Sequence, residues 1–296
     1  MNSEAVQEDM MMDGGRYAMD GCATFYRRHR FSLVKKYEVE FNKAAQSYMD
    51  GTADGGDRKR NVTRLMKPNV ALILVLEGVD PSSGRRGDSS DRALVCVANT
   101  HIHANHELAD VKLWQVHTLL KGLEKIAISA NIPMVVAGDL NSMPGSAPHT
   151  LMLQRHVSAA HKDLHRDPLH LFSGPSSSNK LSHSLHLRSA YAAAASCTVR
   201  SAELDSLVAQ LDHEHHEPKY TNVTHDFKET LDYLVCSTPE LQPTALLELP
   251  ELRDMIGDDM HAGLPNARWP SDHIALMAEF QFDFMMSPSR DGSGVA

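Results

Sequence analysis

The sequence contains few cysteines and no long hydrophobic run. Its four cysteines form no CxxC pair, which argues against a disulfide framework and against a cysteine zinc site. The longest apolar run, residues 70–76, has the length of a strand, whereas a helix needs about 20 apolar residues to cross a bilayer. Neither end combines a basic flank with an apolar stretch, so no export signal is expected. We therefore expect an intracellular protein, cytoplasmic, nuclear or both, that does not contact a membrane.

Basic residues are outnumbered by acidic ones. The chain has 29 Lys and Arg against 38 Asp and Glu, which gives a net charge of -9. This balance argues against broad electrostatic adhesion to nucleic acid, because such binding depends on Lys and Arg that neutralise phosphates. It does not argue against a nuclease that holds a phosphodiester with divalent cations, since carboxylates bind those cations and the cations reverse the local field.

The order of strand and helix patterns indicates a layered α/β domain. Residues 69–77 and 93–100 are short apolar runs with polar borders, as in buried strands, and residues 134–137 form another run before Gly138. Between them, apolar residues recur at helical spacing over 113–127. Further strands are expected at 231–236 and 273–280, and a β-hairpin with a polar turn at 22–34. The order predicts an α/β sandwich of two facing sheets with outer helices.

Four segments differ in character from this domain. Residues 1–18 have no apolar periodicity and are expected to be disordered or a wrongly assigned start, and 284–296 are expected to be a frayed tail. Residues 173–180 and the acidic, His-rich residues 212–217 are expected to be surface insertions, with solvated histidines and no bound metal. One domain is therefore expected over 19–283.

Polar clusters occur at or near the ends of the predicted strands. They are Thr100-His101, Gly138-Asp139-Leu140-Asn141-Ser142, Asp232-Tyr233 with Asn222 and Phe227 upstream, and Ser271-Asp272-His273. Each alone is explained more simply as a turn, a helix cap or a buried hydrogen-bonded pair. Together they suit phosphodiester hydrolysis, because magnesium needs only one or two protein carboxylates and a carboxylate-held histidine exchanges protons near neutral pH.

Several sequence blocks resemble the endonuclease/exonuclease/phosphatase superfamily. GDLNSMPGSAPHTLM, TLDYLVCS and PSDHIALMAEF occur in the order of its signature blocks. Other stretches, among them NVALILVLE and VCVANTHIHANHELADVKLWQVHTLLKGLEKI, are similar to carbon-catabolite-repressor-type deadenylases, especially plant forms. The similarity covers residues 20–282 apart from the insertions. It implies a two-sheet, four-layer sandwich and a 3′-5′ exoribonuclease that removes 3′-terminal adenylate from messenger RNA and releases AMP.

The resemblance also implies a role for individual residues at matching positions. The implied catalytic residues are Asp139, His273 and Asp232, the implied substrate contacts are His101, Asn141, Asn222 and Phe227, and the implied metal-associated residues are Asp139 and Asp272. Asp232 would pair with His273, which stabilises the scissile phosphate, and Phe227 would stack on adenine. Two magnesium ions, single-stranded poly(A) RNA and a Not-type deadenylase complex are the cofactors and partners implied.

Two features depart from the family pattern. The family domain begins with strands that carry an active-site Asn and, in a Leu-Gln-Glu-Val type motif, the Glu that is the principal magnesium ligand, and neither motif occurs here. We therefore expect a domain that lacks its N-terminal part, with weakened metal binding and catalysis. The alternatives are another phosphodiesterase or phosphatase of the superfamily, or a catalytically inactive fragment or scaffold.

The second departure follows His101. Family members often carry Pro a few residues later, where this chain has Ala104-Asn105-His106. Of the histidines in this segment only His101 is expected to face the site, because the spacing between His103 and His106 turns the side chains of a strand apart.

Overall fold

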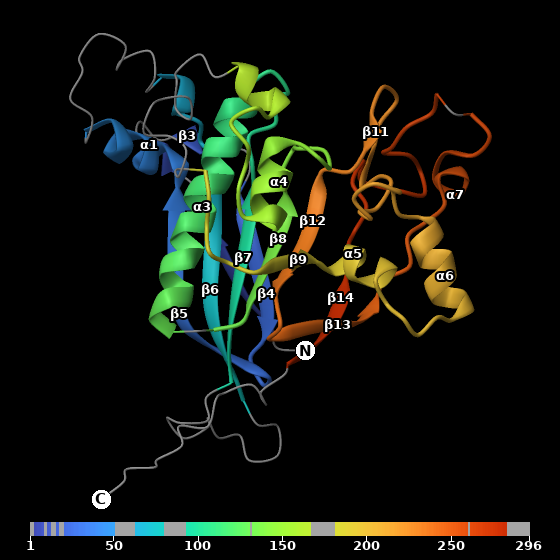
Figure 1. The fold of residues 1–296 in the computed structure, drawn as a ribbon, viewed down its shortest axis with the longest axis horizontal. Helices are drawn as coiled ribbons and strands as arrows, with labels where there is room; N and C mark the ends of the chain where they lie inside the picture. The colour runs from blue at the N-terminus through green and yellow to red at the C-terminus, as the bar shows by residue number, and fades with distance from the viewer. Residues whose placement is uncertain are drawn as a thin grey trace, which may run out of the picture.

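The computed structural model describes residues 3–8, 11–12, 16–17, 21–50, 63–79, 93–130, 132–166, 181–259 and 261–282. Its centre is a six-stranded sheet (Figure 1). The strand order is β5 (Phe31–Glu40), β6 (Val70–Gly78), β7 (Leu94–His101), β8 (Met134–Asp139), β12 (Asp232–Ser237) and β9 (Leu187–Ser189). Only β7 and β8 run parallel within this sheet, as expected for strands joined by the long helix α3 (Ala109–Ala130).

Strand β6 is buried on both faces, which explains its continuous apolar sequence. Ile73 and its alternate neighbours pack against a large core formed with α1 (Phe41–Asp50), α3 and α4 (Ala147–Gln154). Leu72 and Leu74 pack on the other face, against β4 (Cys22–Arg27). Figure 1 shows α3 and α4 in front of the sheet. The expected layered α/β architecture, a central sheet with flanking helices, is confirmed.

The hairpin expected at 22–34 is wrong, although a turn does separate its two strands. Strand β5 pairs with β6, whereas β4 pairs with β1 (Ser3–Glu8) in another sheet. The reason is burial: Cys22 and Tyr26 of β4 lie against the apolar face of β6, so β4 crosses that face and does not extend the sheet edge. Strands β1, β2 (Met11–Met12) and β3 (Arg16–Tyr17) lie at the start of the chain, and β2 pairs with β3.

The remaining elements lie beyond the β12 side of the sheet (Figure 1). They are α5 (Ala190–Ala195), α6 (Ala202–Ala209), β10 (Asn222–Val223), β11 (Lys228–Glu229), β13 (Leu241–Leu246), α7 (Leu252–Ile256) and β14 (Ala278–Phe282), and a 3-10 helix, η1 (Lys162–Arg166), lies near α3 and α4. The strand expected at 273–280 begins only at Ala278, because Asp272 and Ile274 hydrogen-bond instead to the backbone around Thr221 and Val223.

The His-rich residues 212–217 are only partly a surface insertion. His213 and His216 are exposed, as expected, but Glu217 is only 1% exposed. Both carboxylate oxygens of Asp212 accept backbone N–H groups of this segment, including that of Glu217, so the turn is closed and its end is buried. The insertion expected at 173–180 and the tail at 284–296 lie outside the described residues. No helix within the described ranges is both long and apolar enough to cross a membrane.

Gly138 and Gly122 form a matched pair for testing the sheet. Gly138 in β8 has φ +149°, and a Cβ there would lie 2.0 Å from the carbonyl oxygen of Thr100. We expect Gly138→Ala to lower the free energy of unfolding by more than about 1 kcal/mol. Gly122, in the middle of α3 with open space around its Cβ position, should gain about 0.5–1 kcal/mol from the same change. Urea unfolding followed by circular dichroism measures both, and shifts of the same sign would contradict this account.

Candidate active site

The pairing of three strands brings distant residues together at one edge of the sheet. Asp139, the last residue of β8, lies directly opposite His101 on β7 and opposite Asp232 on β12. The parallel strands β7 and β8 both end at this edge, and the antiparallel strand β12 begins there. Backbone register therefore sets the convergence that the sequence implied only through order and spacing.

A tight turn after β8 fixes the orientation of Asp139. Its Oδ1 accepts the backbone N–H of Asn141 at 2.6 Å, and Asn141 itself has φ 46°, a left-handed conformation that Asn tolerates better than most residues. The Asn141 side-chain amide donates to the carbonyl of Ile102 at 2.8 Å, and the Lys112 ammonium donates to the Asn141 carbonyl. The turn is thus tied both to the end of β7 and to α3.

His273 is held by a carboxylate. Its Nδ1 lies 2.8 Å from Oδ2 of Asp232, which also accepts the hydroxyl of Thr221 at 2.7 Å. The hydrogen bond with Asp232 raises the pKa of His273, although partial burial works against it. The arrangement stabilises the imidazolium and leaves Nε2 pointed toward Asp139, with 3.9 Å between Nε2 and Oδ2 of Asp139.

Burial and the charge of Asp232 raise the pKa of Asp139, and the N–H of Asn141 together with His101 and His273 acts in the opposite direction. The His101 Nε2 lies 3.6 Å from Oδ2 of Asp139. The carboxylates of Asp139 and Asp232 repel each other when both are ionised, and a bound cation would reduce this repulsion.

Asp139, Asp232 and His273 each offer a donor atom, and these atoms lie within 4.8 Å of one another. This set fits a divalent cation held mainly by Asp139, because Oδ2 of Asp232 is already engaged by His273 and Thr221. Asp272, expected near the metal, is not part of the cluster: its Oδ2 accepts the side-chain amide of Asn222 at 3.2 Å.

A cavity of about 550 Å³ opens beside these groups. The expected site residues that line it are His101, Asp139, Asn141, Asn222, Phe227, Asp272 and His273, and Asp232 contacts His273. His106 also lines the cavity, contrary to the expectation that only His101 would face the site. The chain leaves the strand after His101, so the alternation of strand side chains no longer applies to His106.

Sequence reasoning missed the residues that support the site. Lys112 is only 7% exposed and lies between apolar neighbours on α3, and Thr221 stands outside the recognised blocks. The loop after Asn141 is anchored by Tyr233, whose hydroxyl donates to the Ser142 carbonyl at 2.6 Å. No local pattern marks Lys112 or Thr221, because their partners are distant in the sequence, whereas Tyr233 belongs to the Asp232-Tyr233 cluster already identified in the sequence.

A buried histidine and glutamate support the same loop. The His149 Nδ1 accepts the N–H of Gly145 at 3.2 Å, and its Nε2 lies 3.3 Å from Oε1 of Glu217. The other oxygen of Glu217 accepts the hydroxyl of Ser189 at 2.8 Å. The end of the His-rich segment is thus connected through His149 to the loop that follows Asp139.

Sequence comparisons find clear similarity to known proteins. A family model described as Endonuclease/Exonuclease/phosphatase family matches residues 6–273. The chain is 47% identical over 274 residues to Carbon catabolite repressor protein 4 homolog 2 of Arabidopsis thaliana, covering 92% of this chain and 44% of that protein. It is 31% identical over 281 residues to the CCR4-Not complex 3'-5'-exoribonuclease subunit Ccr4 of Kluyveromyces lactis, covering 89% and 29%. The resemblance to carbon-catabolite-repressor-type proteins is confirmed, and the chain spans less than half the length of these relatives.

A solved structure shows the same fold. The crystal structure of ANGEL2, a 2',3'-cyclic phosphatase, in complex with adenosine-2',3'-vanadate matches with a TM-score of 0.62 at 24% identity, covering 95% of this chain and 75% of that chain. At this level of identity the likeness concerns the fold alone.

Removing the Asp232 carboxylate tests the electrostatics of the site. We expect Asp232→Asn to lower the pKa of His273, because the hydrogen bond with Asp232 is the main cause of its elevation. Asp272→Asn should lower it far less, since Asp272 is the weakest of the named contributors. Titration of the His273 ring by NMR, without added metal, measures both. Equal effects of the two variants would contradict the assignment.

The hydrogen bond between His273 and Asp232 also predicts how the stability of the protein changes with pH. A histidine whose pKa is raised by folding contributes stability that is fully present below its unfolded pKa and is lost as pH rises through the folded pKa. The stability difference between the wild type and Asp232→Asn should therefore shrink as pH rises above the ordinary histidine range.

Proposed function

The chain belongs to the Endonuclease/Exonuclease/phosphatase family, and from that membership we propose that it carries the site of a magnesium-dependent 3′-5′ exoribonuclease that shortens poly(A) tails and releases AMP. The observation that carries the proposal is the convergence of Asp139, Asp232 and His273 within 4.8 Å at a cavity of about 550 Å³. The printed name of the Kluyveromyces lactis relative, a 3'-5'-exoribonuclease subunit, supports the reaction class.

The side chains divide the chemistry among them. His273, whose charged form is favoured by the hydrogen bond with Asp232, donates a hydrogen bond from Nε2 to an oxygen of the scissile phosphate. Asp139, whose pKa is raised, accepts a proton from the water whose oxygen bonds to phosphorus, while the bond from phosphorus to the 3′ oxygen of the preceding nucleotide breaks and that oxygen takes up a proton. Magnesium held by Asp139 would supply positive charge that offsets the charge developing on the phosphate oxygens.

The residues that line the cavity also suit a nucleotide base. Phe227 lines the cavity. The backbone carbonyl of Phe227 accepts both the N–H and the hydroxyl of Thr224, which fixes the backbone that carries the aromatic ring. Stacking of a base on an aromatic ring contributes about 1–3 kcal/mol. With Asn222 and Asn141 also lining the cavity, this lining favours single-stranded RNA over a phosphosugar as the substrate.

We extend the proposal to the setting in which the reaction occurs. The Kluyveromyces lactis relative is named as a subunit of the CCR4-Not complex, and we propose association with a Not-type complex for this chain as well. Messenger RNA as substrate fits an intracellular location, in the cytoplasm, the nucleus or both.

Separate substitutions of Asp139 and His273 test the proposed reaction. We expect Asp139→Asn and His273→Gln each to slow shortening of 5′-labelled oligo(A) RNA at least about 100-fold, the usual scale for loss of a general acid or base. The assay uses the chain and a form extended by segments of the Arabidopsis relative that lie outside the match, because this chain covers 44% of that protein and lacks a Leu-Gln-Glu-Val type motif.

His156→Gln, an exposed histidine outside the cavity, serves as the control and should retain activity. Thermal unfolding shows whether the variants remain folded. Shortening that persists in both folded variants, or an inactive extended form with the native sequence, overturns the proposed function.

The base-stacking role has its own measurement. Phe227→Ala in the active form should raise KM for oligo(A) by roughly 5-fold or more, the equivalent of about 1 kcal/mol of lost stacking. Hydrolysis of a phosphosugar, which presents no base, should be unchanged by Phe227→Ala. A native enzyme that prefers the phosphosugar to oligo(A) would contradict base recognition.

A further inference from the structure

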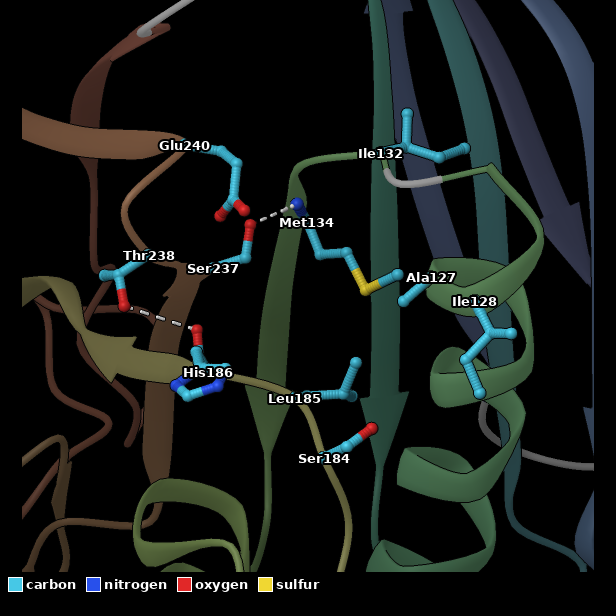
Figure 2. A pocket seen from close by; sticks show the side chains of 10 residues that line it. All are labelled: Ala127, Ile128, Ile132, Met134, Ser184, Leu185, His186, Ser237, Thr238 and Glu240. Atoms are coloured by element: carbon cyan, nitrogen blue, oxygen red, sulfur yellow. Dashed lines mark hydrogen bonds between the residues drawn. The ribbon is translucent and has the colours of Figure 1, made fainter. Parts of the chain in front are cut away.

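A second cavity lies at the end of the sheet opposite the candidate active site (Figure 2). Strand β8 begins at Met134 and ends at Asp139, and β12 begins at Asp232 and ends at Ser237. Met134 and Ser237 both line this cavity, and the Met134 N–H donates to the Ser237 hydroxyl at 2.8 Å. Because a full strand length separates it from Asp139, a ligand bound here leaves the catalytic cavity open.

One side of this cavity is apolar. Ala127 and Ile128, near the end of α3, form this side together with Ile132 (Figure 2). Met134 and Leu185 lie between it and the opposite, polar side. Ile128 is 77% exposed. A single exposed isoleucine is ordinary on a protein surface, but here it extends an apolar wall outward to the rim.

The other side is polar and carries a carboxylate. Ser237, Thr238, His186 and Glu240 form it in Figure 2, where the Glu240 carboxylate points toward Ser237. The Oε2 atom of Glu240 is shielded from solvent and has no hydrogen-bond partner among the described residues. An unpaired buried carboxylate oxygen is costly, so this wall favours a ligand that donates hydrogen bonds and carries positive charge.

Two basic side chains near these segments, Lys121 and Arg155, have partners of their own. Lys121 pairs with Glu124, whose other oxygen accepts the N–H of Ser184. The Arg155 guanidinium contacts Nε2 of His186 at 3.4 Å. No lysine or arginine is among the described residues that line the cavity.

We propose that this cavity is a docking site for the side chain of an arginine or lysine on a protein partner. The aliphatic stem of such a side chain packs against Ile128, Ile132 and Met134, and its charged head donates to Glu240, as amphipathic basic side chains do elsewhere. The volume, about 270 Å³, is below the roughly 300–1,000 Å³ of pockets that enclose a drug-sized ligand. It suits one inserted side chain, with the rest of the partner covering Ile128.

The test uses the whole chain, labelled at Ile and Met methyl groups, and follows Ile128, Ile132 and Met134 by NMR. N-acetyl-arginine methylamide is the probe, and N-acetyl-norleucine methylamide, with an aliphatic stem but no charge, is its match. We expect saturable shifts with the arginine probe and at least about 10-fold weaker binding of the norleucine probe, the factor that corresponds to a charge-assisted hydrogen bond of about 1.4 kcal/mol.

Glu240→Gln, which keeps the shape of the side chain, should weaken the arginine probe at least about 10-fold and leave the norleucine probe unchanged. Glu203→Gln, on the exposed face of α6, is the control that alters neither. In the native chain, added salt should weaken only the arginine probe, which gives a reading that does not depend on a variant.

Three outcomes overturn the proposal. The first is the absence of methyl shifts with the arginine probe, and the second is equal binding of the two probes or no effect of Glu240→Gln in a folded variant. The third is agmatine, a free guanidine, binding at least 10-fold more tightly than the arginine probe, since this would make the cavity a site for a small metabolite.

Discussion

The pairing of β8 with its neighbours β7 and β12 holds the molecule and its site together. Asp139 stands opposite His101 on one side and Asp232 on the other, and the missing side chain at Gly138 allows the backbone of Thr100 to approach closely. A slip of one residue in either ladder would turn every side chain to the opposite face of the sheet. The chemistry at this edge therefore depends on backbone hydrogen bonds laid down well inside the sheet.

Charged groups of both signs lie close together at the candidate site. Asp139 and Asp232 concentrate negative charge, and burial makes the ionised form of Asp139 costly. The hydrogen bond with Asp232 favours the charged form of His273, and the ammonium of Lys112 donates to the Asn141 carbonyl in the adjacent turn. A bound cation would offset the remaining negative charge of the two carboxylates.

The sequence predicted those parts of the fold that short-range patterns determine. Strand β6 is buried on both faces, so its apolar run is unbroken, and the helical spacing after it marks α3. Where the outcome depends on distant partners, prediction failed: β4 lies across the sheet because of Cys22 and Tyr26, and β14 starts late because the backbone around His273 bonds to residues near Thr221. The site residues were implied by family motifs, while Lys112 and Glu217 became visible only through their contacts.

The closed turn that ends at Glu217 has a consequence for variation in this part of the chain. Asp212 accepts the N–H groups of Glu214, His215 and Glu217, and Glu217 in turn contacts His149, which accepts the N–H of Gly145 in the loop that follows Asp139. Such a turn tolerates changes of side chain at the outward positions His213 and His216. It does not tolerate a change of length, because one inserted or deleted residue would move Glu217 away from His149 and Ser189. Homologous chains with the same turn should therefore keep the number of residues between Asp212 and Glu217, even where the residues between them differ.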